Sequence, residues 1–230
     1  MTGWSVVVPL KRLTQAKTRL SALPVPLRQA LVVAMARDVR DAVLSCRDVK
    51  EVVIVTRDPL WRSLMGVRGL RFVAEAPTDS LNDALRRGSA ACRGASRGWA
   101  VAALTADLPA LTPAELHLAL AHVDVAPTFF VPDAQGDGTT LVAARSHAEF
   151  RPLYGVGSRA RHLEAGALEV LRPELTGLRQ DVDTVEDLAL ARTLRLGERT
   201  RVVVSHLLPE KVGRAGNCHA RRRTHPRADE

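Results

Sequence analysis

Short runs of β-branched and apolar residues alternate along this chain with longer stretches of helical period. Such alternation is typical of a mostly parallel sheet whose strands are joined by crossover helices. The expected strands span 4–8, 51–56, 71–74, 100–105, 128–131 and 140–144, and the expected helices span 28–45, 81–95, 158–166 and 184–196. A length of 230 residues suits one such unit. We therefore expect a single α/β domain with a mostly parallel central sheet flanked by helices.

Composition argues against several other classes of protein. Apolar residues make up 46% and charged residues 25% of the chain, which is ordinary for a globular protein. No apolar run reaches the roughly 18 residues that a membrane span needs, and the N-terminus enters the first expected strand without a charged leader. The cysteines Cys46, Cys92 and Cys218 have neither disulfide-framework nor zinc-site spacing. We expect a cytoplasmic protein that does not bind membranes.

The positive charge is concentrated at the C-terminal end. Of the net charge of +8, residues 199–230 carry +5, so residues 1–198 are nearly balanced. We expect a domain over 1–198 and a flexible basic tail over 199–230. One alternative is a basic nucleotide- or nucleic-acid-binding module whose tail supplies the affinity. A base-stacking surface is poorly supplied, because aromatic residues make up only 3% of the chain, so no nucleic-acid partner is expected.

The loop after the first expected strand, Pro9–Leu20, is rich in cations. It contains Lys11, Arg12, Lys17 and Arg19. Ligands of open α/β sheets bind beyond the carboxyl ends of the strands, and this loop follows the first such end. It has neither a P-loop nor a dinucleotide-binding glycine pattern. Lys17 and Arg19 are candidates to bind triphosphate oxygens; the alternative is a solvated loop with ordinary surface cations.

Two acidic motifs are candidate metal ligands. Asp107 directly follows a buried strand, where a metal bound to phosphates would be needed. In the extended segment around Val182, Asp181 and Asp183 point to the same side because strand side chains repeat every two residues. Two carboxylates that face one way repel each other unless a cation lies between them. The alternatives are a turn cap for Asp107 and an N-cap at Asp183 or Thr184.

Two glycine-rich segments, 136–141 and 154–160, could bring backbone N–H groups close to an anion. Ser158 begins an expected helix, whose N-terminus favours phosphate or carboxylate; a hairpin turn followed by a capped helix is the alternative. Asn82 could hydrogen-bond a base edge, whereas Ser80 could simply cap the helix that contains it, with Asp83 as its partner. Thr112 is likewise expected to cap a helix. The histidines show no metal-site spacing and are expected to be surface or packing residues.

Together these motifs resemble the phosphoenolpyruvate or 2-phospho-L-lactate guanylyltransferases of coenzyme F-420 biosynthesis. The resemblance spans about residues 4–196 and follows the order of motifs in that family. It rests on Val8-Pro9-Leu10-Lys11, Ala16-Lys17-Thr18-Arg19-Leu20, Ser80-Leu81-Asn82-Asp83-Ala84-Leu85, Thr105-Ala106-Asp107-Leu108-Pro109-Ala110-Leu111, Asp137-Gly138-Thr139-Thr140, Gly155-Val156-Gly157-Ser158-Arg159-Ala160-Arg161-His162 and Asp181-Val182-Asp183-Thr184.

The resemblance implies a Rossmann-like, GT-A-like nucleotidyltransferase that transfers GMP from GTP to the phosphate of a three-carbon phosphoacid and releases diphosphate. The product from phosphoenolpyruvate is enolpyruvoyl-diphospho-5'-guanosine, which a downstream transferase of the same pathway would receive. The implied sites are magnesium ligands at Asp107, Asp181 and Asp183, acceptor-binding residues at Thr140, Gly155 and Ser158, nucleotide-binding residues at Lys11, Lys17, Arg19 and Asn82, and catalytic residues at Lys17, Arg19 and Asp107.

The acceptor itself stays open at this point. Phosphoenolpyruvate is preferred by analogy with actinobacterial members, while 2-phospho-L-lactate, 3-phosphoglycerate or another phosphorylated acceptor, such as a sugar phosphate or molybdopterin, are alternatives. A phosphate acceptor is already ionised at neutral pH, so the reaction needs no general base. Positioning and electrostatic stabilisation would therefore supply most of the catalysis.

Overall fold

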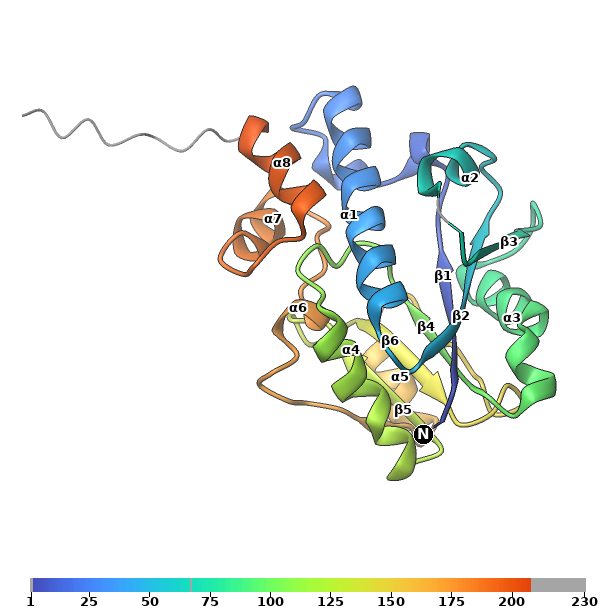
Figure 1. Ribbon diagram of the computed structural model, residues 1–230. Helices are drawn as coiled ribbons and strands as arrows, with labels where there is room; N and C mark the ends of the chain where they lie inside the picture. The colour runs from blue at the N-terminus through green and yellow to red at the C-terminus, as the bar shows by residue number, and fades with distance from the viewer. Residues whose placement is uncertain (1, 67, 208–230) are drawn as a thin grey trace, which may run out of the picture.

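A mixed sheet of seven strands forms the centre of the computed structural model, which describes residues 2–66 and 68–207 (Figure 1). The strands are β1 (Trp4–Pro9), β2 (Val49–Thr56), β3 (Leu70–Ala74), β4 (Ala100–Leu104), β5 (Thr128–Pro132), β6 (Thr139–Ala144) and β7 (Leu168–Glu169). Their order is β3-β2-β1-β4-β6-β5-β7, and β6 runs antiparallel to both of its neighbours while the other pairs are parallel. The expected mostly parallel α/β fold is confirmed.

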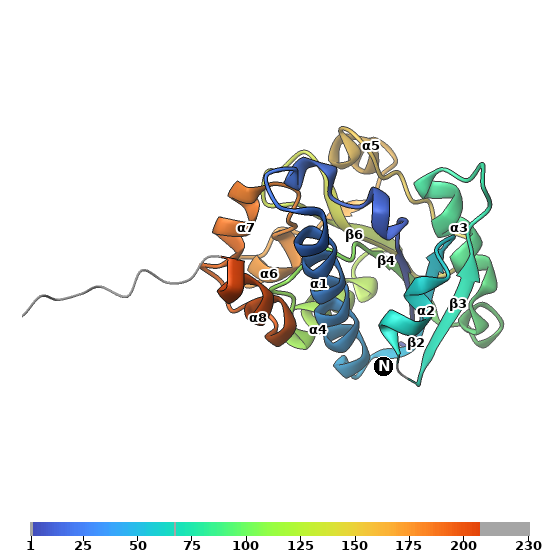
Figure 2. The same ribbon diagram turned by 90° about the horizontal axis from the view of Figure 1, so that it is seen from above.

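Helices cover both faces of this sheet (Figures 1 and 2). They are α1 (Val25–Ser45), α2 (Leu60–Met65), α3 (Leu81–Ala91), α4 (Pro113–Leu120), α5 (Ser158–Glu164), α6 (Thr176–Arg179), α7 (Val185–Ala191) and α8 (Glu198–Leu207), with 3-10 turns η1 (Leu13–Gln15), η2 (Thr18–Leu20), η3 (Arg93–Arg97) and η4 (Ala121–Asp124). The sequence pattern did not predict α2, α6, α8 or the two-residue strand β7. Within residues 2–66 and 68–207, no helix combines the length and apolar character that crossing a bilayer requires.

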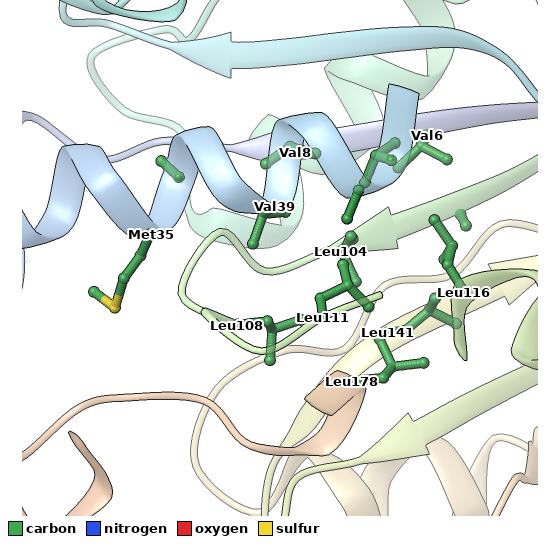
Figure 3. Close-up of a cluster of buried hydrophobic side chains, with 14 of the residues drawn as sticks. Val6, Val8, Met35, Val39, Leu104, Leu108, Leu111, Leu116, Leu141 and Leu178 are labelled. Atoms are coloured by element: carbon green, nitrogen blue, oxygen red, sulfur yellow. The ribbon is translucent and has the colours of Figure 1, made fainter. Parts of the chain in front are cut away.

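Alternating side chains of β1 enter two separate cores. Val6 and Val8 face α1, where they join Met35 and Val39 in the larger cluster (Figure 3). Val7 faces the opposite side, toward α3. Helix α3 packs close to the strands because Gly88 has no side chain: a Cβ there would lie 2.5 Å from Val7 Cγ1. The side chains on both faces of the central strands are therefore buried, as expected for a sheet covered by crossover helices.

Local capping signals fix where three of the helices begin. Ser80, Thr112 and Thr184 are the N-caps of α3, α4 and α7, and each forms a capping box with the acidic residue three positions later. The expected caps at Ser80 and Thr112 are confirmed. At α7 the N-cap is Thr184, so the Asp183 side chain is left available for other contacts.

The segment that was expected to begin a flexible tail instead continues as helix α8, which packs against α1 (Figure 2). Asp38 of α1 accepts hydrogen bonds from the backbone N–H groups of Arg199 and Thr200, which begin this helix. Val204 buries its side chain in the core beside them. Net charge alone predicted a solvated tail, but the apolar residues of this segment order it. The rest of the predicted tail, 208–230, lies outside the described residues.

Candidate active site

A cavity of about 570 Å³ opens beyond the carboxyl ends of β1 and β4. Its walls come from the loops after these strands, the β5–β6 turn, the loop before α5 and the segment before α7. This is the position where open α/β sheets bind their ligands. Residues from 9 to 187 meet here, so nearly the whole length of the domain contributes to one site.

The Asp181-Val182-Asp183 segment lies beside the loop that carries Asp107. The Val182 N–H donates a hydrogen bond to the Asp107 carbonyl oxygen over 3.1 Å. The Val182 side chain is fully buried in the core, while Asp181 and Asp183 both line the cavity. Alternation along this extended segment therefore places both carboxylates on the side that holds Asp107, as the sequence pattern predicts.

Lys17 lies between two of the three expected metal ligands. Its Nζ donates hydrogen bonds to Asp107 Oδ2 and, over 2.6 Å, to Asp183 Oδ1. The two oxygens are consequently no farther apart than two hydrogen bonds, about 6 Å. Arg19 extends the cluster, because its Nη1 lies 3.2 Å from Asp183 Oδ2. The sequence predicted these cations in a loop open to phosphate, whereas the structure pairs them with carboxylates distant in the chain.

The backbone around Lys17 is held in an unusual conformation. Lys17 has φ of 53°, a left-handed value that costs a residue with a side chain about 1–2 kcal/mol. Two other contacts anchor the loop: the Trp61 indole N–H donates to the Lys11 carbonyl, and the Leu13 N–H donates to Asp58 Oδ2. Helix α2, which the sequence did not predict, thus fixes the cationic loop over the cavity.

Burial and charge shift the ionisation of this cluster in opposite directions. Burial disfavours the charged forms of Lys17 and Asp107, but their mutual attraction outweighs it. The pKa of Lys17 is therefore raised and the pKa of Asp107 is lowered. Burial, followed by the negative charge of Asp107, raises the pKa of Asp181 to about 7. The cavity thus holds more negative charge than the lysine beside it offsets.

The chemistry of the cluster fits a hard divalent cation. Asp107 Oδ1 is buried and has no hydrogen-bond partner among the described residues. Carboxylate oxygens are the protein ligands that magnesium prefers. Over residues 2–66 and 68–207, however, no group of three or more acidic, histidine or cysteine side chains is already arranged around a metal position. Lys17 instead supplies the positive charge between Asp107 and Asp183, while Asp181 lines the same cavity.

The loop before α5 forms the opposite wall of the cavity. Gly155 has φ of 125° and Gly157 has φ of 65°, values that favour glycine. Gly155 and Ser158 line the cavity as expected, but Thr140 does not. The Thr140 hydroxyl is buried against the Val131 carbonyl, and its neighbour Thr139 lines the cavity instead. Neighbouring side chains of a strand point to opposite faces, and the register between β5 and β6 is irregular at this point.

Asn82 holds this loop in place. Its Nδ2 donates to the Tyr154 carbonyl over 3.1 Å, and its Oδ1 accepts from the Tyr154 N–H over 2.8 Å. Each end of the amide is therefore bonded to the backbone of Tyr154, which gives Asn82 a role in positioning the loop. On the other side of the loop, His162 Nε2 accepts a hydrogen bond from the Leu153 N–H.

Asp133 shapes a further part of the cavity that the sequence analysis missed. Its carboxylate accepts hydrogen bonds from the backbone N–H groups of Gly136, Asp137 and Gly138. Gly138 is required by this arrangement, since a Cβ there would lie 2.3 Å from Asp133 Oδ2. An aspartate that closes a turn onto following glycines is the signal that could have identified it.

Comparison with known sequences gives one consistent family. The family model described as guanylyl transferase CofC like matches residues 4–195. A phosphoenolpyruvate guanylyltransferase of Thermomonospora curvata is 47% identical over 204 residues, which cover 89% of this chain and 90% of that protein. The phosphoenolpyruvate guanylyltransferase of Streptomyces coelicolor is 44% identical over 206 residues, covering 89% and 97% of the two chains.

Solved structures support the fold at lower identity. A nucleotidyl transferase from Methanothermobacter superposes with a TM-score of 0.59 at 23% identity, covering 83% of this chain and 96% of its own. A Mycobacterium tuberculosis protein solved in complex with manganese superposes with a TM-score of 0.53 at 19% identity, covering 83% and 98%. These likenesses confirm the nucleotidyltransferase-type fold. The family model that matches residues 4–195 and the relatives at 44–47% identity show that this chain belongs to the CofC-like guanylyl transferase family.

Proposed function

We propose that this protein transfers GMP from GTP to the phosphate of phosphoenolpyruvate, with magnesium, and releases diphosphate. The proposal rests on the family membership and on the naming of relatives at 44–47% identity. The structural observation that carries it is the cluster of Lys17, Asp107 and Asp183 in a cavity, where Lys17 comes from the cationic loop after β1. A site for two phosphorylated substrates needs this combination of cations and metal-binding carboxylates.

In this proposal, Asp107, Asp181 and Asp183 hold magnesium, and the cations of the first loop bind the triphosphate. Magnesium, when bound, supplies positive charge that lets two polyanions approach each other. Lys17 can bind phosphate oxygens once the carboxylates have another cation, and Arg19 is already exposed at the rim. Lys11 lines the cavity beside them. Asn82 is not included, because its amide is committed to Tyr154.

The reaction then depends on electrostatics more than on proton transfer. A phosphate oxygen of the acceptor attacks the α-phosphorus of GTP, the bond from that phosphorus to the bridging oxygen breaks, and diphosphate leaves. Each pair of unit charges 4 Å apart repels by about 4 kcal/mol at an effective dielectric near 20. The cations of the site offset this repulsion and stabilise the charge of the transition state. No proton needs to be removed, because the acceptor phosphate is ionised at neutral pH.

We place the acceptor against the loop that contains Gly155 and Ser158, with Thr139 in the position first expected for Thr140. Phosphoenolpyruvate is the acceptor named for the relatives; 2-phospho-L-lactate and 3-phosphoglycerate present the same two anionic groups. The product from phosphoenolpyruvate, enolpyruvoyl-diphospho-5'-guanosine, would pass to a downstream transferase of coenzyme F-420 biosynthesis.

The test is diphosphate release by the purified protein with GTP, magnesium and each of the three acceptors. The proposal predicts release that requires both magnesium and an acceptor, and that is fastest with phosphoenolpyruvate. Chelation of the metal should stop the reaction, and added magnesium should restore it. Absence of release with every acceptor would refute the proposed reaction. Faster release with another acceptor would retain guanylyl transfer and change only the substrate.

A further inference from the structure

Arg161 is a cation beside the proposed acceptor loop that has no partner among the described residues. It lies on α5, and its Nη2 would be 2.9 Å from a Cβ placed on Gly155. Its Nε and Nη2 are buried and make no hydrogen bond within the described part of the chain. By contrast, Arg159 on the same helix forms an ion pair with Glu169 and donates to the Gly136 carbonyl.

Buried guanidinium nitrogens without a partner are costly, because they lose water and gain neither a counter-charge nor a hydrogen bond. Two cations at the opposite wall of the cavity are already paired: Lys17 with Asp107 and Asp183, and Arg19 with Asp183. The charge of Arg161 is also felt by its neighbour, since it contributes to lowering the pKa of His162. An anion that binds next to Gly155 would supply the missing counter-charge.

The acceptor has such an anion. The residues assigned to its wall, Gly155, Ser158 and Thr139, are all uncharged, whereas phosphoenolpyruvate carries a phosphate and a carboxylate. The phosphate must lie toward Asp107 and Asp183, because it attacks GTP there. The carboxylate is attached to the carbon that bears the phosphate oxygen, so it lies beside the phosphate and can face the loop at Gly155. Gly155 lines the cavity, and because it has no side chain, the Arg161 guanidinium lies directly beside it, just behind the residues that line the cavity.

We infer that Arg161 is an acceptor-binding residue whose positive charge recognises the carboxylate of the phosphoacid. This inference rests on the proposed function, since it needs the acceptor to lie against Gly155 and Ser158. It explains why the site would select phosphorylated carboxylic acids over other phosphate esters. A hydrogen bond to a charged group contributes enough free energy to change affinity by about 30-fold.

The test pairs a change in Arg161 with a change in the ligand. Arg161→Gln and the wild-type protein are assayed for diphosphate release with phosphoenolpyruvate and with its carboxamide analogue, in which a neutral amide replaces the carboxylate. In the wild type, the amide should lower kcat/KM by about 30-fold, and in Arg161→Gln by less than about 3-fold. The KM for GTP should change by less than about 2-fold. An equal loss with the amide in both proteins would overturn the inference, because a purely structural role does not depend on the carboxylate.

Three further variants make the result interpretable. Arg151→Gln removes a positive charge from an exposed residue outside the cavity and should leave both KM values unchanged. Should Arg161→Gln not fold, as judged by circular dichroism, Arg161→Lys replaces it. Its ammonium cannot make the paired contacts of a guanidinium, so the 30-fold discrimination should fall below about 10-fold; unchanged discrimination would overturn the inference.

Ser158→Ala separates this inference from the proposed function. It should raise the KM for phosphoenolpyruvate and for the amide by similar factors, because the hydroxyl belongs to the proposed acceptor site but not to carboxylate recognition. Suppose that Ser158→Ala raises these KM values, but that the amide analogue lowers kcat/KM equally in the wild type and in Arg161→Gln. Then only the role of Arg161 is refuted. If Ser158→Ala changes neither value, the acceptor site itself is misplaced, and the inference falls with it.

Discussion

The two walls of the cavity are built in different ways. One wall consists of charged side chains: Lys17 reaches Asp107 and Asp183, which lie 90 and 166 residues farther along the chain. The other wall is a glycine-containing loop whose backbone is held in place by Asn82 and His162. Charged side chains thus form the wall where we propose that the phosphates react, and the backbone shapes the wall where we propose that the acceptor binds. Changes to the first wall should therefore lower kcat, and changes to the second should raise the KM for the acceptor.

The largest expected effect follows from Asp107→Asn. The substitution keeps the size of the side chain but removes a proposed metal ligand and the counter-charge of Lys17, so we expect kcat to fall by about a thousandfold or more. The rate of diphosphate release measures it, with circular dichroism to show that the fold survives. Asp124→Asn, at an exposed position in η4, is the matched control and should keep full activity. If Asp107→Asn retained more than a tenth of the activity, Asp107 would not be a metal ligand needed for catalysis.

His162 behind the second wall should make stability depend on pH. Burial, with a smaller contribution from the Arg161 charge, lowers the pKa of this histidine to about 4, against 6.5 for the free side chain. Between these values the unfolded state binds the proton more readily, so stability is fully present above about pH 6.5 and is lost as the pH falls toward 4. The loss from this residue should be roughly 2 kcal/mol once solvent screening is allowed for.

Urea unfolding between pH 7.5 and 4 measures this effect. His162→Gln lacks the titrating group, so its free energy of unfolding should fall less over the same interval, and the gap between the two proteins should narrow as the pH decreases. Parallel curves for the two proteins would show that His162 does not become harder to protonate on folding.

Gly155→Ala should weaken acceptor binding by about 20-fold. The backbone at φ of 125° is poorly accessible to alanine, and the new Cβ would press on Arg161 Nη2. Gly157→Ala is the natural comparison, because Gly157 also has a positive φ but nothing lies within 4 Å of its Cβ position. We expect a smaller rise there, below about 5-fold, since left-handed alanine costs about 1–2 kcal/mol and no contact is added. Equal KM values for phosphoenolpyruvate in the two variants would argue against close packing at Gly155.

The smallest expected effect comes from Asn82→Ala. It removes both hydrogen bonds to the Tyr154 backbone, and the resulting freedom of the loop should raise the KM for phosphoenolpyruvate by about 10-fold. The KM for GTP should stay within about 2-fold, which distinguishes a residue that positions the acceptor loop from one that binds the nucleotide. Ser80→Ala weakens the same helix at its cap by about 1 kcal/mol without touching Tyr154, and should leave both KM values in place. If only the KM for GTP rose, Asn82 would instead be a nucleotide-binding residue.

The contrast between the walls also explains which features the sequence could predict. Strands β1 to β6, the caps at Ser80 and Thr112, and the common direction of Asp181 and Asp183 follow from local rules of alternation and capping. The loop after the first strand is expected to border a ligand site because ligands of open α/β sheets bind beyond the carboxyl ends of the strands. All of these can be recognised from neighbouring residues alone.

Contacts between distant segments could not be predicted in the same way. Nothing near Asn82 indicates that its amide will meet the backbone of Tyr154, 72 residues away. Thr139 lines the cavity where the strand register is irregular, and the start of α8 is bonded to Asp38 in another helix. Such features arise only when the chain is folded.

The most direct test of the two-wall account is a crystal structure with manganese, a non-hydrolysable GTP analogue and phosphoenolpyruvate. We predict a metal ion roughly 2.1 Å from carboxylate oxygens of Asp107 and Asp183, the Lys17 ammonium on the triphosphate, and the acceptor between that metal and the loop at Gly155. A metal ion that shares no ligand from Asp107 or Asp183, or an acceptor bound away from this loop, would contradict the account.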